Sequence, residues 1–214
     1  MKIWIFSILT AAIAYFFGSL STMLIASRLV FRTNLRRLGR GSAWLSNFSR
    51  LYGVKGFIKL ALVEFVKDAI PVILGGLLFS SGGNKEVGRA LALFCLVLGR
   101  MYPSMYGFRG GYATAAIGIG ALFVNFSLGA AVLLAAALVG FFTRYLSIGT
   151  LVGAIALAIV GVLVVDSDLA VKLCIFTAVL AVVRMVPAIS RVAARKEPRL
   201  KFEKDISYKF DEKL

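Results

Sequence analysis

Histidine is absent from the 214-residue sequence, and cysteine occurs only twice. The absence of histidine removes the commonest general base and the commonest metal ligand from any site that the chain forms. Cys95 and Cys174 both lie inside apolar runs, so we interpret them as packing residues and predict no disulfide framework. On the same grounds we predict neither a metal site nor a cofactor.

Charged residues are scarce, at 16% of the chain, and acidic ones are the rarer kind, with 10 Asp and Glu against 25 Lys and Arg. Soluble domains have about 25% charged and about 45–50% apolar residues, whereas this chain is 60% hydrophobic with a mean hydropathy of +0.89. Apolar runs of membrane-spanning length recur along it, which indicates a polytopic membrane protein. The net charge of +15 is clustered, which indicates topology and contact with anionic membrane lipid. No soluble basic domain is present, so we predict no nucleic-acid partner.

Seven apolar segments are predicted to span the membrane as helices. They cover residues 3–25, 54–79, 90–102, 113–126, 128–142, 151–165 and 169–186. The first is too long for a signal-peptide core and lacks a clear small-residue cleavage site, so we expect it to be retained. The polar stretch at residues 80–89 is predicted as a loop, and residues 144–150 as a short polar connection.

The positions of the basic residues predict the orientation of these helices. If the N-terminus lies outside, four segments that hold nearly all the Lys and Arg fall on one side: residues 28–50, 99–114, 144–150 and 190–214. The positive-inside rule places that side in the cytoplasm. The predicted fold is therefore an all-α polytopic membrane helix bundle of about seven transmembrane helices. Its N-terminus is outside, a membrane domain covers residues 1–189, and residues 190–214 form a basic cytoplasmic tail.

Charged residues interrupt the second apolar segment, at Lys55, Lys59, Glu64, Lys67 and Asp68, before Pro71. Charges at membrane depth are costly and usually face a protein interior or a wet cavity. Glu64 stands about one helical turn from Lys67 and Asp68, which is a spacing that permits pairing. An alternative is that the first half of this segment lies at the membrane interface.

Three of the predicted cytoplasmic segments combine arginine with glycine or hydroxyl residues. They are GRGSAWLSN at residues 39–47, GFRGGYAT at 107–114 and RYLSIGT at 144–150. A glycine pair beside arginine lets bare backbone N–H groups and a guanidinium approach one anion together. Each segment alone is equally consistent with a basic loop, a topology-setting charge or helix caps. Together they predict a site for an anionic, phosphorylated molecule at the membrane surface.

The order and spacing of these residues resemble the bacterial membrane glycerol-3-phosphate acyltransferases that use an acyl-phosphate donor, the PlsY type. The resemblance covers about residues 15–200. Three family motifs, roughly GSGNxGATN…VxRxxG, GHxxPxxxxFKGGKGxAT and RxxSxxS, are matched in one register. The matching residues are Gly39, Gly41, Asn47, Arg50 and Gly53, with Ser46 for threonine; Gly99, Pro103, Phe108, Gly110 and Gly111, with Arg109 for lysine; and Arg144, Ser147 and Thr150.

Several positions depart from the family pattern. Arg40 and Ser42 replace a serine and an asparagine of the first motif, and Arg100 and Tyr112 replace the histidine and the GGK lysine of the second. In a C-terminal HxxN…RLxxGxE pattern, Arg191 and Glu197 remain, whereas Met185 and Ala188 stand for histidine and asparagine. Replacing lysine by tyrosine removes a full positive charge. Arginines at 40, 100 and 109 restore charge with a different geometry.

The resemblance implies a multi-pass protein of the cell inner membrane that contacts membrane lipid. It implies transfer of an acyl group from acyl-phosphate to the 1-hydroxyl of glycerol-3-phosphate, giving lysophosphatidate for phospholipid synthesis. The residues that it assigns to substrate and phosphate binding are Gly41, Ser42, Ser46, Asn47, Arg50, Arg109, Gly110, Gly111, Arg144, Ser147, Thr150, Arg191 and Glu197. The altered positions are Arg40, Arg100, Tyr112, Met185 and Ala188. No catalytic residue is assigned.

The altered positions keep two further hypotheses open. One is a catalytically degenerate paralogue that binds a lipid or phosphate ligand, or regulates a true enzyme. The other is an acyltransferase with a different acceptor, for which Trp44 and Tyr112 reshape the pocket. A transporter-like bundle has less support, because the sequence has no convincing internal repeat. Catalytic activity, acyl-chain preference and oligomeric state are left open by the sequence.

Overall fold

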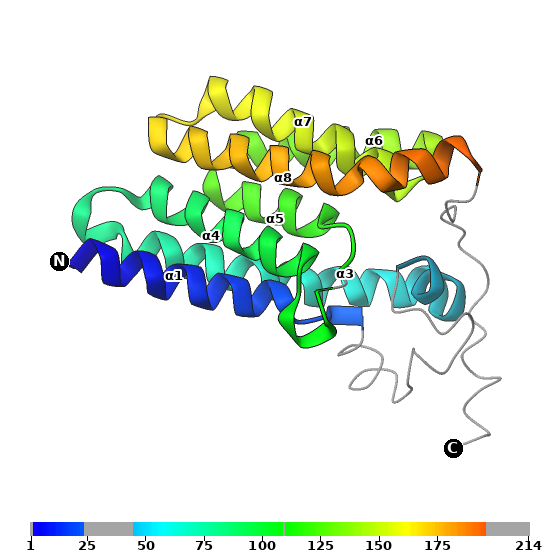
Figure 1. Cartoon of the computed structure of the whole chain (residues 1–214), viewed down its shortest axis with the longest axis horizontal. Coiled ribbons are helices and arrows are strands. Elements are labelled where there is room, and N and C mark those ends of the chain that lie inside the picture. The colour runs from blue at the N-terminus through cyan, green and yellow to red at the C-terminus, as the bar shows by residue number, and fades with distance from the viewer. Residues whose placement is uncertain (1, 24–44, 109, 196–214) are drawn as a thin grey trace, which may run out of the picture. The chain divides into compact units, whose positions relative to one another are not determined.

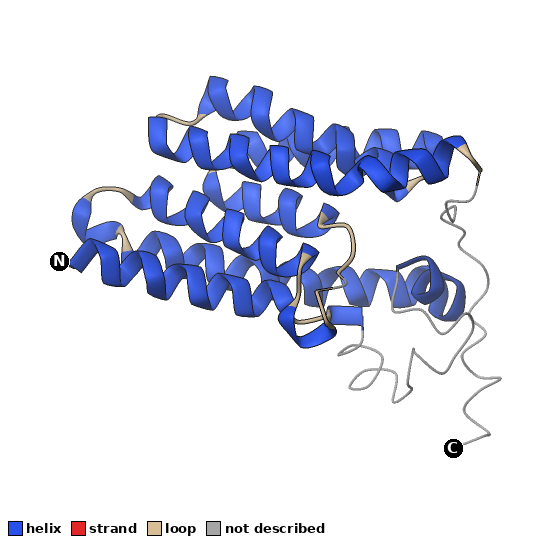
Figure 2. Cartoon of the chain, in the orientation of Figure 1, coloured by secondary structure: helices blue, strands red, loops and turns tan. Residues whose placement is uncertain are grey.

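The structure is a computed structural model that describes residues 2–23, 45–108 and 110–195, with the backbone alone for residues 2, 45–55, 57 and 81. Every regular element in these ranges is a helix (Figure 2), which confirms the predicted all-α class. The long helices are α1 (Lys2–Ser19), α3 (Leu45–Leu78), α4 (Lys85–Met101), α5 (Thr114–Val124), α6 (Phe126–Thr143), α7 (Leu146–Val164) and α8 (Asp168–Ala193). Two short 3₁₀ turns, η2 (Ser80–Gly82) and η3 (Ser104–Tyr106), lie in the connections on either side of α4.

The chain divides into two compact units, of which the first contains the candidate site. This unit comprises Met1–Leu20 and Val66–Glu197, and the second comprises Ser21–Phe65 and Pro198–Leu214. Within the first unit, consecutive helices run in alternating directions (Figure 1). The C-terminal ends of α1, α4, α6 and α8 therefore lie at the same end as the N-terminal ends of α5 and α7. Most of the segments predicted to bind an anion are brought to this one end.

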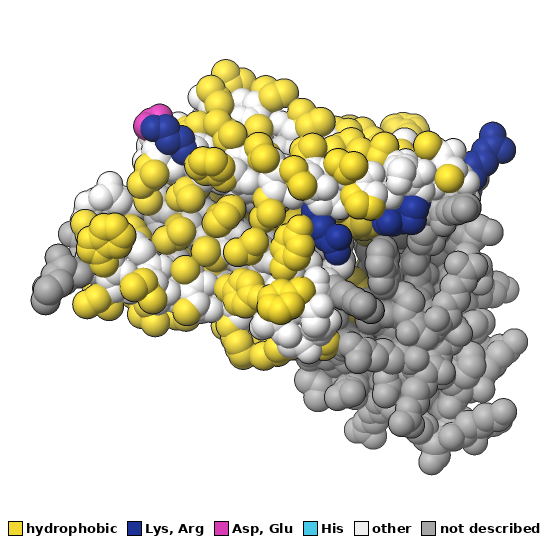
Figure 3. Space-filling view, in the orientation of Figure 1, with side chains coloured by type: hydrophobic (Ala, Val, Ile, Leu, Met, Phe, Trp, Pro, Cys, Tyr) yellow, Lys and Arg dark blue, Asp and Glu magenta, His cyan; other side chains and the backbone are white. Residues whose placement is uncertain are grey.

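The outer surface of the first unit has the character of a lipid-facing surface. Among the described helices, α6, α7 and α8 are long and apolar enough to cross a membrane, and α1 and α5 are shorter apolar helices. Large apolar side chains point outward, including Phe126, Phe141 and Phe142, each more than three-quarters exposed. The face in Figure 3 is accordingly mostly apolar, with Lys and Arg side chains toward its ends. These features agree with the predicted membrane helix bundle.

Glycines allow α4 to pack closely against its neighbours. A Cβ atom on Gly18 of α1 would lie 2.1 Å from the Leu96 carbonyl oxygen, and one on Gly99 of α4 would lie 2.3 Å from the Tyr15 carbonyl oxygen. The α3–α4 crossing is similar, because a Cβ on Gly88 would lie 2.2 Å from the Gly75 carbonyl oxygen. Small residues at helix crossings are typical of membrane bundles, where close backbone approach supplies the packing energy.

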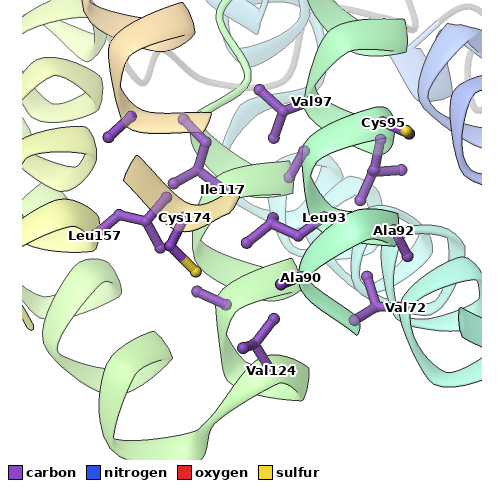
Figure 4. Close-up of a cluster of buried hydrophobic side chains, with 14 of the residues drawn as sticks. Val72, Ala90, Ala92, Leu93, Cys95, Val97, Ile117, Val124, Leu157 and Cys174 are labelled. Carbon is purple, nitrogen blue, oxygen red and sulfur yellow. The ribbon is translucent and has the colours of Figure 1, made fainter. Parts of the chain in front are cut away.

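The centre of the first unit is a continuous apolar core. It contains side chains from α3, α4, α5, α7 and α8, including Val72, Leu93, Val97, Ile117, Leu157 and Cys174 (Figure 4). Cys95 and Cys174 are buried and unbridged within this core. Both cysteines are therefore packing residues, as predicted.

Polar side chains join the helices at the other end of this unit. The Glu86 carboxylate accepts a hydrogen bond from the Ser167 N–H at 3.0 Å, which ties the start of α4 to the start of α8. The Asn125 side chain accepts from the N–H groups of Ser127 and Leu128 and caps α6. Its amide also donates to the Val164 carbonyl oxygen at 3.0 Å. These bonds hold the helix ends together at the end remote from the candidate site.

The charged residues of α3 that belong to the first unit face its interior. Asp68 is fully buried, and the Lys67 ammonium lies 2.7 Å from its carboxylate. Lys67 also donates to the Phe17 carbonyl oxygen of α1 at 3.3 Å. The expectation that charges at this depth face protein is confirmed for Lys67 and Asp68.

Several predicted helix boundaries were wrong. The loop predicted at residues 80–89 ends early, because α4 begins at Lys85, and the connection at 144–150 is mostly the first turn of α7. The first helix ends at Ser19, and α8 continues through Pro187 to Ala193. Hydropathy marks the part of a helix that contacts lipid, whereas backbone hydrogen bonding continues into the polar turns beyond it.

Candidate functional site

The candidate site is built around the α4–α5 segment, which we define as residues 102–113. Pro103 and the η3 turn begin it, and Gly107 and Phe108 follow with φ angles of +63° and +59°. Their N–H groups donate to the carbonyl oxygens of Ser104 and Pro103, closing a tight turn. Glycine adopts this left-handed backbone without strain, which explains Gly107. The turn reverses the chain and directs residues 110–113 back along the end of α4.

The two glycines of the predicted anion cradle have different surroundings. A Cβ on Gly110 would lie 2.2 Å from the Arg100 carbonyl oxygen and 2.5 Å from that of Met101, so Gly110 packs directly on the last turn of α4. A Cβ on Gly111 would have no described atom within 4 Å. Packing therefore accounts for glycine at position 110, whereas Gly111 has open space beside its backbone.

Arg184 of α8 binds the α4–α5 segment at two points. Its Nη2 donates to the Gly110 carbonyl oxygen at 3.2 Å, and its Cζ lies 5.4 Å from the centroid of the Tyr102 ring. That distance is typical of a cation–π contact. The Tyr102 carbonyl oxygen in turn accepts a hydrogen bond of 2.8 Å from the Tyr15 hydroxyl of α1. The segment is thus attached to α1, α4 and α8.

Arg191 of α8 contacts the residue that departs most clearly from the family motif. Its Nη2 donates to the Tyr112 hydroxyl at 3.0 Å. The predicted motif match places Tyr112, a neutral acceptor, where the family has a positively charged lysine. The guanidinium of Arg191 brings a positive charge from α8 to the side chain of Tyr112.

Ser147 and Thr150 of the third motif lie in the first turns of α7. The Thr150 hydroxyl is buried, donates to the Leu146 carbonyl oxygen at 2.8 Å and is hydrogen-bonded to the Thr114 hydroxyl. Because Thr114 begins α5, this bond joins the second motif to the third. Ser147 is also buried, and its hydroxyl has no hydrogen-bond partner among the described residues. A buried hydroxyl without a partner is costly, so it marks a place where a ligand atom would be favourable.

The other described motif residues have structural surroundings. Arg144 is exposed and ends α6 with a left-handed φ of +60°. Arg100, which the predicted motif match aligns with the family's histidine, donates to the Leu20 carbonyl oxygen at 3.2 Å and so ties α4 to the end of α1. Met185 and Ala188 of α8, predicted to stand for a histidine and an asparagine, are fully buried in apolar packing.

Part of the predicted site lies outside the described residues or in a segment whose backbone alone is described. Arg40, Gly41, Ser42, Arg109 and Glu197 lie outside the described residues. Ser46, Asn47 and Arg50 lie in the first turns of α3, where only the backbone is described. Among the described residues, Gly110, Tyr112, Arg191 and the Thr114–Thr150 pair are brought to one end of the first unit.

Arg184 was not among the residues predicted for the site, and it lies within the seventh predicted apolar segment, residues 169–186. A signal was present, because Arg184 lies seven residues before Arg191 and so on the same face of α8, two turns earlier.

The electrostatic character of this end follows from the sequence. No Asp or Glu occurs between Glu86 and Asp166, nor between Asp168 and Glu197. Helices α5, α6 and α7 therefore carry no acid, and neither does α4 after its first turn. The arginines at 100, 144, 184 and 191 make this end of the described chain strongly basic. Such an arrangement favours anionic ligands.

The sequence was compared with known families and proteins. A sequence model of the family described as "Glycerol-3-phosphate acyltransferase" matches residues 8–195. A protein of that name from Cupriavidus metallidurans is 30% identical over 203 residues, which cover 94% of this chain and 99% of the relative. One from Finegoldia magna is 29% identical over 199 residues, covering 92% and 98% respectively.

Solved structures have the same fold. A crystal structure of PlsY (YgiH), an integral membrane glycerol 3-phosphate acyltransferase, in its glycerol 3-phosphate form superposes with a TM-score of 0.74 at 21% identity, covering 91% of this chain and 96% of that one. The lysophosphatidic acid form also gives 0.74, at 19% identity, covering 95% and 98%.

Proposed function

The chain belongs to the glycerol-3-phosphate acyltransferase family, and from this premise we propose that it acylates the 1-hydroxyl of glycerol-3-phosphate with an acyl-phosphate donor. The products would be lysophosphatidate and inorganic phosphate, and the reaction would serve phospholipid synthesis. The family match extends over residues 8–195, so it includes all three motifs. Relatives of that name match nearly end to end, which supports the same activity for the whole chain.

The observation that carries the proposal is the meeting of three separate segments at one strongly basic end of the first unit. The Thr114–Thr150 hydrogen bond joins the second motif to the third, and α8 contacts the second motif through Arg184 and Arg191. Both substrates carry phosphate, which is well bound by guanidinium groups, backbone N–H groups and hydroxyls. Among the described residues, we assign phosphate binding to Gly111, Ser147 and Arg191.

The chemistry requires little of the protein beyond binding and orientation. The 1-hydroxyl oxygen of glycerol-3-phosphate attacks the carbonyl carbon of the donor, and the bond from that carbon to the phosphate oxygen breaks. The leaving phosphate keeps the electron pair and takes the hydroxyl proton. This route needs no histidine, which the chain lacks. The chain would then supply alignment of the two substrates and stabilisation of the negative charge that develops on the carbonyl oxygen.

We further propose that the helices cross the cell inner membrane seven times, with the N-terminus outside and the basic end in the cytoplasm. The seven long helices in the described residues and their alternating directions in the first unit support this count. Residues 1–189 would form the membrane domain and residues 190–214 a cytoplasmic tail. A cytoplasmic site gives direct access to water-soluble glycerol-3-phosphate, while the product remains in the lipid.

The proposal is tested with the purified full-length chain reconstituted in phospholipid vesicles. A long-chain acyl-phosphate and glycerol-3-phosphate are added, and inorganic phosphate and lysophosphatidate are measured together. Equal amounts of both products, absent when glycerol-3-phosphate is omitted, support the proposed reaction. If the chain turned over another polyol phosphate but not glycerol-3-phosphate, that compound would be identified as the acceptor in place of glycerol-3-phosphate. The proposed function would be refuted if the chain neither turned over nor bound any of these compounds.

A non-catalytic phosphate- or lipid-binding protein is the second candidate. The full burial of Met185 and Ala188 favours it, because apolar packing replaces two polar side chains of the family pattern. In the vesicle experiment this candidate predicts binding of glycerol-3-phosphate without release of phosphate from the donor.

A further inference from the structure

Arg184, near the end of α8, binds a backbone carbonyl and an aromatic ring of the α4–α5 segment. Its Nη2 donates to the Gly110 oxygen at 3.2 Å, while its guanidinium lies against the Tyr102 ring. Two separate points of the α4–α5 segment are therefore held by one side chain of α8. Tyr102 is itself fixed to α1 by the Tyr15 hydroxyl.

The hydrogen bond to Gly110 also determines the direction of the next N–H group. The Gly110 carbonyl and the Gly111 N–H belong to one planar peptide unit, and the described chain contains no cis peptide bond. In a trans peptide the C=O and N–H bonds point in opposite directions. A carbonyl held toward Arg184 therefore directs the Gly111 N–H away from α8.

Gly111 offers both a donor and room for a ligand. No other described backbone group accepts a hydrogen bond from its N–H. No described atom lies within 4 Å of the place where a Cβ would stand on Gly111. A partly buried N–H group needs an acceptor, and a phosphate oxygen in this open space would satisfy it.

We propose that Arg184 is a positioning residue that aims the Gly111 N–H at the phosphate group of a substrate. It acts through the Gly110 carbonyl and through Tyr102. The inference rests on the proposed function. The inference adds Arg184 to the site, although the family motifs do not include it. It also assigns different roles to the two glycines. Gly110 holds the segment against α4 and α8, and Gly111 presents the donor.

The experiment compares Arg184→Met, Arg184→Gln and Arg184→Lys in the full-length vesicle-reconstituted chain. KM is measured for glycerol-3-phosphate and for the acyl-phosphate separately, together with kcat and the thermal unfolding midpoint. Arg184→Met is expected to raise KM for one substrate by about tenfold to a hundredfold, with kcat changed by less than about threefold. The substrate whose KM rises is the one whose phosphate Gly111 binds.

The other two variants separate positioning from charge. Glutamine keeps an N–H donor that can bind the Gly110 carbonyl but lacks the positive charge, so Arg184→Gln is expected to recover part of the loss. Arg184→Lys keeps both the positive charge and N–H donors. Recovery by neither Arg184→Gln nor Arg184→Lys would overturn the proposal, because an N–H donor at position 184 would then have no effect on KM. A matched control is Lys172→Met at the other end of α8, where Lys172 forms an exposed ion pair with Asp168. This control is expected to leave both KM values unchanged.

Failure of this inference is distinguishable from failure of the proposed function. If the wild-type chain turns over and Arg184→Met keeps both KM values, the inference alone is overturned. A fall in kcat and unfolding midpoint at unchanged KM would overturn it too, since that result indicates a merely structural role. If the wild-type chain neither turns over nor is thermally stabilised by glycerol-3-phosphate, the proposed function fails and the inference fails with it.

Discussion

Gly110 and Gly111 have different surroundings, so we predict that substitution of Gly110 lowers protein stability whereas substitution of Gly111 weakens substrate binding. Replacing either glycine by alanine adds one methyl group. At Gly110 that carbon would lie 2.2 Å from the Arg100 carbonyl oxygen, more than 1 Å inside the 3.4 Å at which ordinary contact begins. At Gly111 it would enter open space, and the φ angle of Gly111 lies outside the left-handed region.

The size of each effect follows from these surroundings. Forcing a methyl group into a packed contact costs about 1–3 kcal/mol. For a chain of this size that cost lowers the unfolding midpoint by about 2–12 °C. We therefore expect Gly110→Ala to destabilise the protein by this amount. Gly111→Ala is expected to keep the midpoint within about 2 °C but to raise KM for a phosphate-bearing substrate about tenfold or more, because its methyl group occupies the space of the ligand.

A thiol-reactive fluorophore provides the stability assay. The chain's two cysteines, Cys95 and Cys174, are both buried, so they react only when the protein unfolds. KM is measured with the vesicle-reconstituted chain as above. An unchanged midpoint for Gly110→Ala would refute the packing argument. If Gly111→Ala had the same KM values as the wild type, the hypothesis that a substrate phosphate binds beside the Gly111 backbone would be refuted.

Three further substitutions test other contacts. Tyr112→Phe removes the acceptor of the Arg191 hydrogen bond, and we expect KM for a substrate to rise about threefold to tenfold in steady-state kinetics with little change in unfolding midpoint. Ser147→Ala removes a buried hydroxyl that has no partner among the described residues. Without substrate its midpoint should stay equal or rise, while kcat/KM falls about tenfold or more if the hydroxyl binds phosphate; an unchanged kcat/KM would exclude that role. Asn125→Ala removes the cap of α6 and the bond to Val164 at the remote end, so it should lower the midpoint by about 2–8 °C and leave both KM values unchanged.

Much of the fold could be predicted because each helix carries its own apolar signal. The central part of each of the seven predicted apolar segments is helical in the described residues. The ends could not be predicted from hydropathy. Glu86 and Arg89 are polar and helical, because the first turns of α4 extend beyond its apolar part and Glu86 binds α8.

The site was predicted less completely than the fold. The motif spacing identified Gly110, Tyr112 and Arg191, which lie together in the structure. Arg184 was missed because its partner is a backbone carbonyl, and no pattern of side chains marks such a contact. At the end of an apolar run, an arginine is also what the positive-inside rule predicts for topology alone.

The glycines at the helix crossings have a consequence for which substitutions this sequence can tolerate. A side chain on Gly18 would meet the backbone of α4 at Leu96, which no substitution elsewhere can make smaller. A side chain on Gly118 would instead meet the Leu133 Cδ2 atom at 2.2 Å, and a shorter residue at 133 would remove that obstacle. A genetic screen for second-site suppressors should therefore restore Gly118→Ala through Leu133, while Gly18→Ala has no such partner. Both glycines allow close helix packing, but only Gly118 can be replaced when a second residue changes with it.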